Sequence, residues 1–118
     1  MKLTLLSAGK DLIHIGCEGE ISQREFQPGE KPLASLLGPA GFTHAVLMNL
    51  EKTTYIDSSG IGWLLACHKQ FVANGGILVL HSVPPRVDHI LQIVRMPLVL
   101  HIAADEAAAR AVALEGRK

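Results

Sequence analysis

The stretch AVLMNLEKTTYIDSSGIGWLLACHKQFVANGG, residues 45–76, decides the fold that this sequence predicts. It opens with the nearly all-apolar run Ala45–Leu50, which is typical of a central strand covered on both faces of a sheet. From Ile61 the apolar residues recur at helical spacing until Asn74-Gly75-Gly76, so the pattern predicts a helix that begins near Ser58 and ends at those glycines. A buried strand followed by such a helix is the repeating unit of an α/β protein.

The region before this unit predicts a hairpin and one short helix. Leu3–Ser7 and Leu12–Cys17 have the composition of strands, and the glycine of Ala8-Gly9-Lys10-Asp11 between them suits a tight turn. The segment from Gly19 to Gly41 is rich in proline and glycine, which leaves room only for a short helix near Leu33–Leu37.

The region after this unit continues the alternation of strands and helices. Ile77–Leu80 predicts another buried strand, and Ser82 predicts the cap of a helix that Pro97 ends. Leu98–Ile102 predicts a last short strand, and Asp105-Glu106 opens an alanine-rich helix with a basic end. We therefore expect an α/β fold with a mixed central sheet and helices packed against it.

Composition indicates one globular domain over residues 1–118, because 48% of the residues are hydrophobic and 19% are charged. Eleven basic and eleven acidic residues give a net charge of zero, which argues against nucleic acid or a membrane surface as the partner. No apolar run approaches the ~20 residues that span a bilayer, and the N-terminus lacks the apolar region of a secretory signal. We expect a cytoplasmic protein.

The segment Asp57-Ser58-Ser59-Gly60 lies between the central strand and the long helix, where α/β proteins commonly place their sites. Its simplest interpretation is a helix cap, which Asp57 or Ser58 can provide. A phosphate on either serine would meet the first amides of the helix and the positive end of its dipole. Gly60 and Gly62 each cost roughly 0.8–1 kcal/mol of helix propensity relative to alanine, which suggests that another group approaches closely.

Catalytic and metal chemistry find little support in the sequence. Ser58 lacks a Gly-x-Ser-x-Gly elbow, and His68 lies one helix face away from it. The turn has neither the Gly-Lys-Ser/Thr of a P-loop nor a third glycine at dinucleotide spacing.

Cys17 and Cys67 are predicted to be reduced core thiols, and the histidines lack metal-ligand spacing. Trp63 is predicted in the core, or else as an interface anchor. We expect a binding protein without a cofactor or metal, and not an enzyme.

Several segments together carry a resemblance to a known family. They are Gly19-Glu20-Ile21, Asn49-Leu50-Glu51, Tyr55-Ile56-Asp57-Ser58-Ser59-Gly60-Ile61-Gly62 and Asn74-Gly75-Gly76 followed by Ile77–Leu80. In this order and spacing, the chain resembles the STAS domains of anti-sigma factor antagonists over almost its whole length. Ser22 stands where that family carries an aspartate.

This resemblance implies a switch in protein binding. In such domains the serine after the aspartate, Ser58 here, is phosphorylated by a partner that is both a serine kinase and an anti-sigma factor. The unphosphorylated domain binds this partner, phosphorylation breaks the complex, and a phosphatase reverses the modification. The implied partner-binding surface consists of Asp57, Ser58, Ser59, Gly60, Ile61, Gly62 and Ser22. The alternative is a STAS-type binding module without phosphorylation, either a subunit of a signalling or transport complex or a small-ligand sensor.

Overall fold

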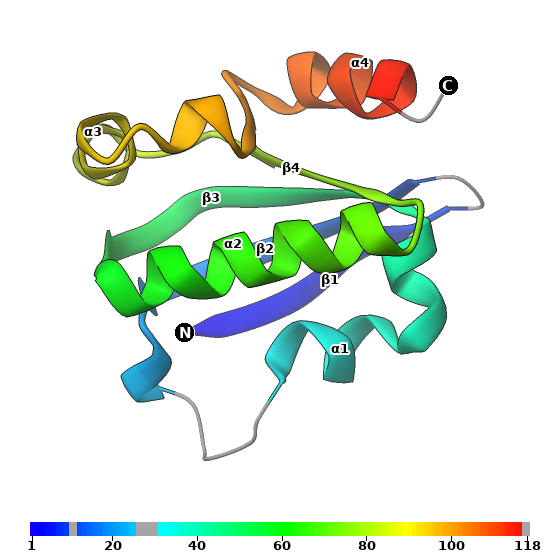
Figure 1. The fold of residues 1–118 in the computed structure, drawn as a ribbon, viewed down its shortest axis with the longest axis horizontal. Coiled ribbons are helices and arrows are strands. Elements are labelled where there is room, and N and C mark those ends of the chain that lie inside the picture. The colour runs from blue at the N-terminus through cyan, green and yellow to red at the C-terminus, as the bar shows by residue number, and fades with distance from the viewer. Residues whose placement is uncertain (10–11, 26–30, 117–118) are drawn as a thin grey trace.

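The computed structural model describes residues 1–9, 12–25 and 31–116. Within them the chain forms five strands, which are β1 (Lys2–Ala8), β2 (Leu12–Ile21), β3 (Ala45–Ile56), β4 (Ile77–His81) and β5 (His101–Ala103). The α-helices are α1 (Pro32–Leu37), α2 (Ser58–Ala73), α3 (Pro85–Ile93) and α4 (Glu106–Gly116). Short 3₁₀ helices are η1 (Gln23–Glu25), η2 (Pro39–Thr43) and η3 (Met96–Leu98). Figure 1 shows this order in space.

The strands form one mixed sheet in the order β1-β2-β3-β4-β5. β1 pairs antiparallel with β2, and every other neighbouring pair is parallel. Helical crossovers between parallel strands account for this arrangement, since parallel neighbours cannot be joined by a tight turn. β3 lies in the middle, and its residues Ala45–Met48 are completely buried. The predicted α/β fold with a mixed sheet and a central buried strand is confirmed.

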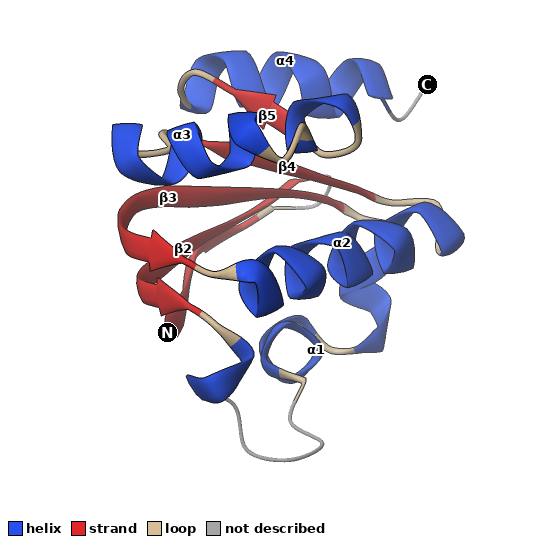
Figure 2. Ribbon diagram, turned by 60° about the vertical axis from the view of Figure 1, so that its left-hand side comes forward, coloured by secondary structure: helices blue, strands red, loops and turns tan. Residues whose placement is uncertain are grey.

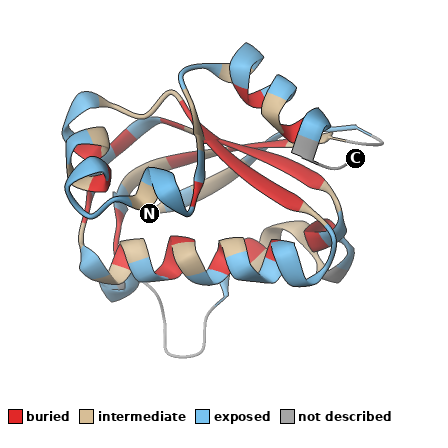
Figure 3. Ribbon diagram, turned by 45° about the horizontal axis from the view of Figure 1, so that its top comes forward, coloured by how far each residue is buried: buried red, intermediate tan, exposed pale blue. Residues whose placement is uncertain are grey.

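Helices cover both faces of the sheet, with α1 and α2 on one side and α3 and α4 on the other (Figure 2). The larger buried cluster joins strand residues such as Met48 and Leu80 to Trp63 and Phe71 of α2. A smaller cluster brings Leu47 and Val79 together with two alanines of α4, which lie at positions 109 and 113. Figure 3 shows the buried residues concentrated in the central strands and on the inner side of α2.

Most predicted elements are present, and β2 and β3 extend well beyond their predicted ends. The hairpin of β1 and β2, the short helix α1, the long helix α2 and the strand β4 are confirmed. β2 continues to Ile21 and β3 continues to Ile56, and these two residues are paired in the parallel ladder. This pairing places the carboxyl ends of two neighbouring strands together, just before α2. Lys10, Asp11 and the basic end Arg117-Lys118, which belong to predicted turns and tails, lie outside the described residues.

Three local predictions are wrong. The helix predicted to end at Pro97 ends at Ile93, because Arg95 has a left-handed backbone with φ of 58° and Pro97 lies in η3. Ser82 does not cap α3, because it has a left-handed backbone with φ of 55° and its hydroxyl bonds to Nδ1 of His81 at 2.9 Å. Pro84 occupies the N-cap position, followed by a proline at the first helical position. The predicted strand Leu98–Ile102 begins only at His101, because the preceding residues form η3 and the amide of Leu100 bonds to the carbonyl of Met96.

Candidate functional site

The first turn of α2 is capped by Asp57. This residue leaves β3 with an extended backbone, and its Oδ1 accepts a hydrogen bond from the amide of Gly60 at 2.9 Å. The hydroxyl of Ser59 donates to the same oxygen at 2.6 Å. Of the two caps that the sequence allowed, Asp57 is the one that the structure uses, and the Gly60 amide is therefore already occupied.

The end of β2 supplies the other side of this turn. Ser22 is almost completely buried, with 1% of its surface exposed, and its hydroxyl donates to Oδ2 of Asp57 at 2.6 Å. The backbone N–H and the Nε–H of Arg24 both donate to the oxygen of Ser22 at 3.3 Å. The predicted site residue Ser22 therefore meets the predicted turn through a direct hydrogen bond.

Two residues of η1 join this network although no sequence pattern marked them. The backbone N–H of Gln23 donates to the hydroxyl oxygen of Ser59 at 3.0 Å, and its side-chain Nε2 donates to the carbonyl of Ser59 at 3.1 Å. Arg24 places its Nη2 atom 3.6 Å from Oδ2 of Asp57. Only the fold brings η1 next to the first turn of α2. The one available sequence signal was their position directly after Ser22.

These contacts keep Asp57 ionised. Hydrogen bonds from Ser22, then from Ser59 and the amide of Gly60, lower the pKa of Asp57 to about 2, and the positive charge of Arg24 adds to this effect. Each donor stabilises the charged carboxylate relative to the protonated acid. The turn therefore carries a fixed negative charge at neutral pH, directly before Ser58.

Ser58 is the exception in this turn. Ser58 is exposed, and its hydroxyl forms no hydrogen bond to another residue in the described part of the chain. Its neighbour Ser59 is bonded to both Asp57 and Gln23. The turn therefore presents the Ser58 hydroxyl to the solvent while the groups around it are held in place.

The two glycines of the first turns have different causes. A Cβ atom on Gly60 would lie 1.9 Å from the carbonyl oxygen of Ile21, so the close approach that the sequence suggested is made here by the end of β2. Gly62 is exposed, and a Cβ atom there would meet nothing within 4 Å. Ile61 between them is half-buried and packs against the main core. Only Gly62 leaves open surface beside Ser58.

Other predicted candidates lie in the interior. Trp63 is 9% exposed and packs in the core, as predicted. Both cysteines are unpaired and buried, and burial raises the pKa of Cys17 to about 11 and that of Cys67 to about 12. Within residues 1–9, 12–25 and 31–116, no group of three or more His, Cys, Asp or Glu residues could hold a metal ion. In the same residues, no helix combines the length and apolarity needed to cross a membrane.

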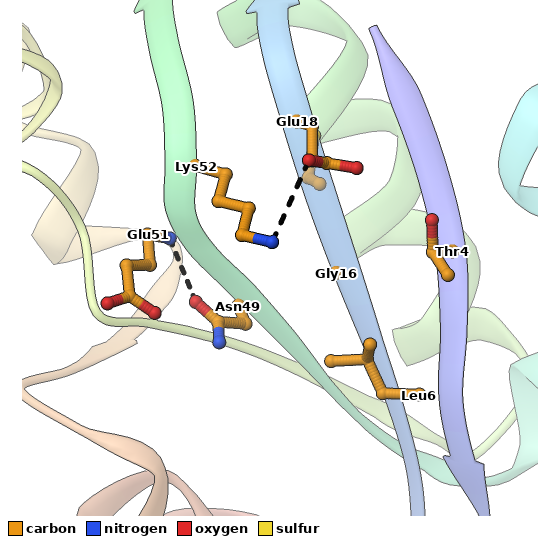
Figure 4. Close-up of a pocket in the computed structure, with 8 residues that line it drawn as sticks. Thr4, Leu6, Gly16, Glu18, Asn49, Glu51 and Lys52 are labelled. Atoms are coloured by element: carbon orange, nitrogen blue, oxygen red, sulfur yellow. Dashed lines mark hydrogen bonds and ion pairs between the residues drawn. The ribbon is translucent and has the colours of Figure 1, made fainter.

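A second candidate region is a shallow hollow of about 300 Å³ on the part of the sheet formed by β1, β2 and β3 (Figure 4). Gly16 lies at its centre, with Thr4 and Leu6 on one side. On the other side Nζ of Lys52 lies 3.9 Å from Oε1 of Glu18. This hollow is open and mixed in polarity, and none of the residues that line it belongs to the Ser58 turn.

Comparisons with known proteins agree with this architecture. The STAS domain model matches residues 9–109. A candidate anti-sigma factor antagonist of Thermotoga maritima superimposes with a TM-score of 0.78 at 17% identity, over 92% of each chain. The anti-sigma factor antagonist SpoIIAA in its unphosphorylated form gives 0.65 at 16% identity, over 98% of this chain and 99% of SpoIIAA. The Bacillus cell fate determinant SpoIIAA in the phosphorylated form gives 0.64 at 20% identity, over 94% and 99%. At these identities the likeness shows a shared fold.

Proposed function

Because the chain belongs to the STAS domain family, we propose that it is an anti-sigma factor antagonist whose binding is controlled at Ser58. In this proposal the unphosphorylated domain binds an anti-sigma factor that is also a serine kinase. Phosphorylation of Ser58 releases the partner, and a phosphatase restores binding. The solved structures of SpoIIAA in unphosphorylated and phosphorylated forms support it, because both share this fold.

The observation that carries the proposal is the exposed hydroxyl of Ser58 in a turn whose other polar side chains are already hydrogen-bonded. A kinase can reach this hydroxyl without breaking the fold. The added phosphate brings about −1.5 to −2 charges at neutral pH, directly after the ionised Asp57. A partner that contacts this turn would have to bury that charge, which costs several kcal/mol where no cation compensates it.

Substitution of Ser58 tests the proposal directly. We expect Ser58→Ala to keep its affinity for the cognate anti-sigma factor and Ser58→Asp to bind about a hundredfold more weakly, which corresponds to roughly 3 kcal/mol. Isothermal titration calorimetry measures both affinities. Ser35→Asp, which places the same charge on an exposed position of α1, is the matched control and should bind normally.

Two results would contradict the proposal. Equal affinities for Ser58→Ala and Ser58→Asp would exclude a charge-controlled interface at this turn. The second result is an intact mass that does not change when the protein is incubated with the cognate kinase and ATP. If the protein still binds its partner normally, this result would favour a STAS module that works without phosphorylation. In that case the hollow of Figure 4 is the first place to test for a small ligand. Candidate ligands would be titrated into the unaltered protein and into Lys52→Ala, which removes a residue that lines the hollow.

A further inference from the structure

Arg24 places a positive charge beside the proposed phosphorylation site. Its Nη2 atom lies 3.6 Å from Oδ2 of Asp57, the residue directly before Ser58. We propose that Arg24 is the counter-ion of phosphorylated Ser58, and that its guanidinium group leaves Asp57 to bind the phosphate. This proposal rests on the proposed function, because it requires a phosphate on Ser58.

Asp57 does not depend on Arg24 for its hydrogen bonds. Oδ1 of Asp57 accepts from Ser59 and from the amide of Gly60, and Oδ2 accepts from Ser22, at 2.6 to 2.9 Å. The 3.6 Å ion pair is longer than these bonds and longer than the ~2.7–2.9 Å of a charge-assisted hydrogen bond. The Asp57 cap would therefore survive a movement of the guanidinium group.

Arg24 is also free to move. Its side chain is 77% exposed, and among the described residues its side-chain contacts are the weak ion pair with Asp57 and the hydrogen bond from Nε to Ser22. Consecutive Cα atoms lie ~3.8 Å apart, so a change of side-chain rotamer is enough to carry the guanidinium from Asp57 toward Ser58.

The chemistry favours the phosphate over the carboxylate. Phosphoserine carries about −1.5 to −2 charges and offers three acceptor oxygens, whereas the Asp57 carboxylate carries one charge and is already bonded. A guanidinium group presents parallel N–H donors that match phosphate geometry. Since Gln23 already fastens η1 to Ser59, the new contact would tie η1 more firmly to the first turn of α2. The free, phosphorylated domain would thus hold its own phosphate.

The test places phosphoserine at position 58 during translation and follows its phosphorus NMR signal against pH. An adjacent cation lowers a phosphate pKa, so we expect the second ionisation in the otherwise unaltered chain to lie about one unit below that of Arg24→Gln. Arg24→Lys should keep most of this difference. Lys69→Gln removes a positive charge about 16 Å further along α2, beyond the screening length of ~8 Å, and should leave the titration unchanged.

A second readout does not need any variant. The Nε–H signal of Arg24 in a nitrogen-15 spectrum should shift when phosphoserine replaces serine at position 58. An unshifted signal would overturn the proposal, and so would identical titrations for the unaltered chain and a folded Arg24→Gln. Because translation supplies the phosphate, the outcome is independent of any kinase. If the cognate kinase never modifies the protein, but Arg24 still binds the phosphate that translation supplies, the proposed function fails and the inference about Arg24 stands.

Discussion

Ser58 and Ser59 are adjacent and chemically identical, but their hydroxyl groups have different surroundings. Ser59 bonds to Oδ1 of Asp57 and accepts from the backbone of Gln23. Ser58 has no such partner among the described residues, and it is exposed. A phosphate on Ser59 would replace the hydroxyl that donates to Asp57 and place a second negative charge against that carboxylate, whereas a phosphate on Ser58 would break no side-chain hydrogen bond among the described residues. The geometry therefore supports Ser58 as the phosphoacceptor of the proposal.

Ser22 is the most deeply buried polar side chain of this network, with 1% of its surface exposed. Ser22→Ala removes a buried hydroxyl that donates to Asp57 and accepts two bonds from Arg24. We expect the free energy of unfolding to fall by about 1–3 kcal/mol, because the charged carboxylate of Asp57 loses a hydrogen-bond donor. Urea unfolding measures this change.

Ser35→Ala on the exposed side of α1 provides the comparison for Ser22→Ala. This control should change stability by no more than about 0.5 kcal/mol, since it removes an exposed side chain. Equal stabilities for the two variants would show that the Ser22 hydrogen bonds do not stabilise the fold.

Among the elements, α2 approaches the end of β2 closely at one point, where the helix begins. The backbone of Gly60 lies against the carbonyl of Ile21, which leaves no room for a side chain. Gly62 lies only two residues further along α2, yet a Cβ atom there would face open space. The same residue type thus serves packing at one position and leaves an open surface at the other.

Alanine at these two positions should have opposite effects. Gly60→Ala should lower the free energy of unfolding by about 1–3 kcal/mol, because its Cβ would overlap the Ile21 backbone at 1.9 Å. Gly62→Ala should raise it by up to about 1 kcal/mol, since alanine is the better helix former and meets no neighbour. Thermal and urea unfolding report both changes. A Gly60→Ala protein as stable as Gly62→Ala would contradict the packing described for the first turn.

At the scale of the whole molecule, a histidine pair links strands on both sides of β3. Nε2 of His14 lies 2.9 Å from Nε2 of His81, and both residues are buried. Such a bond requires one ring nitrogen to donate and the other to accept, so it cannot persist when both rings are fully protonated. On the α4 side, Nδ1 of His14 lies 3.8 Å from Oε1 of Glu106.

This pair makes stability depend on pH. Burial, and then the nearby His14, lower the pKa of His81 below its ordinary value of 6.5. The unfolded chain therefore takes up a proton near pH 6.5 that the folded protein resists. The contribution to stability is complete above pH 6.5 and is lost as the pH falls below that value. We expect urea unfolding to show a less stable protein at pH 5.5 than at pH 7.5.

Two variants separate the sources of this pH dependence. His81→Gln should reduce the stability difference between the two pH values. His68→Gln should reduce it as well, because burial and the nearby His101 also lower the pKa of His68. The lowered pKa values of Asp57 and Glu106 affect stability only below the ordinary pKa values of these groups, 3.8 and 4.5, which lie outside the range from pH 5.5 to 7.5. Stability that is equal or higher at pH 5.5 would contradict the assignment to His81.

Sequence by itself determined the order of the elements and the candidate serine. Apolar periodicity is a local property, so Ala45–Leu50 and the helix after Ser58 could be recognised from their own residues. Local patterns failed at Ser82 and at the start of β5. Ser82 turns its hydroxyl to His81, and β5 is limited to the three residues that pair with β4.

Only the tertiary structure decided how the site is held together. Ser22 and Asp57 are 35 positions apart, and His14 and His81 are 67 apart, so no local pattern can join them. Ser22 and Asp57 meet because the parallel register aligns the end of β2 with the end of β3, and the two histidines meet because β2 and β4 both pair with β3. The resemblance already marks Ser58 as the candidate, and the structure adds that Ser58 is exposed while the hydroxyl of Ser59 is hydrogen-bonded to Asp57 and Gln23. Only the structure could add this, because hydrogen bonding and exposure are properties of the packed chain.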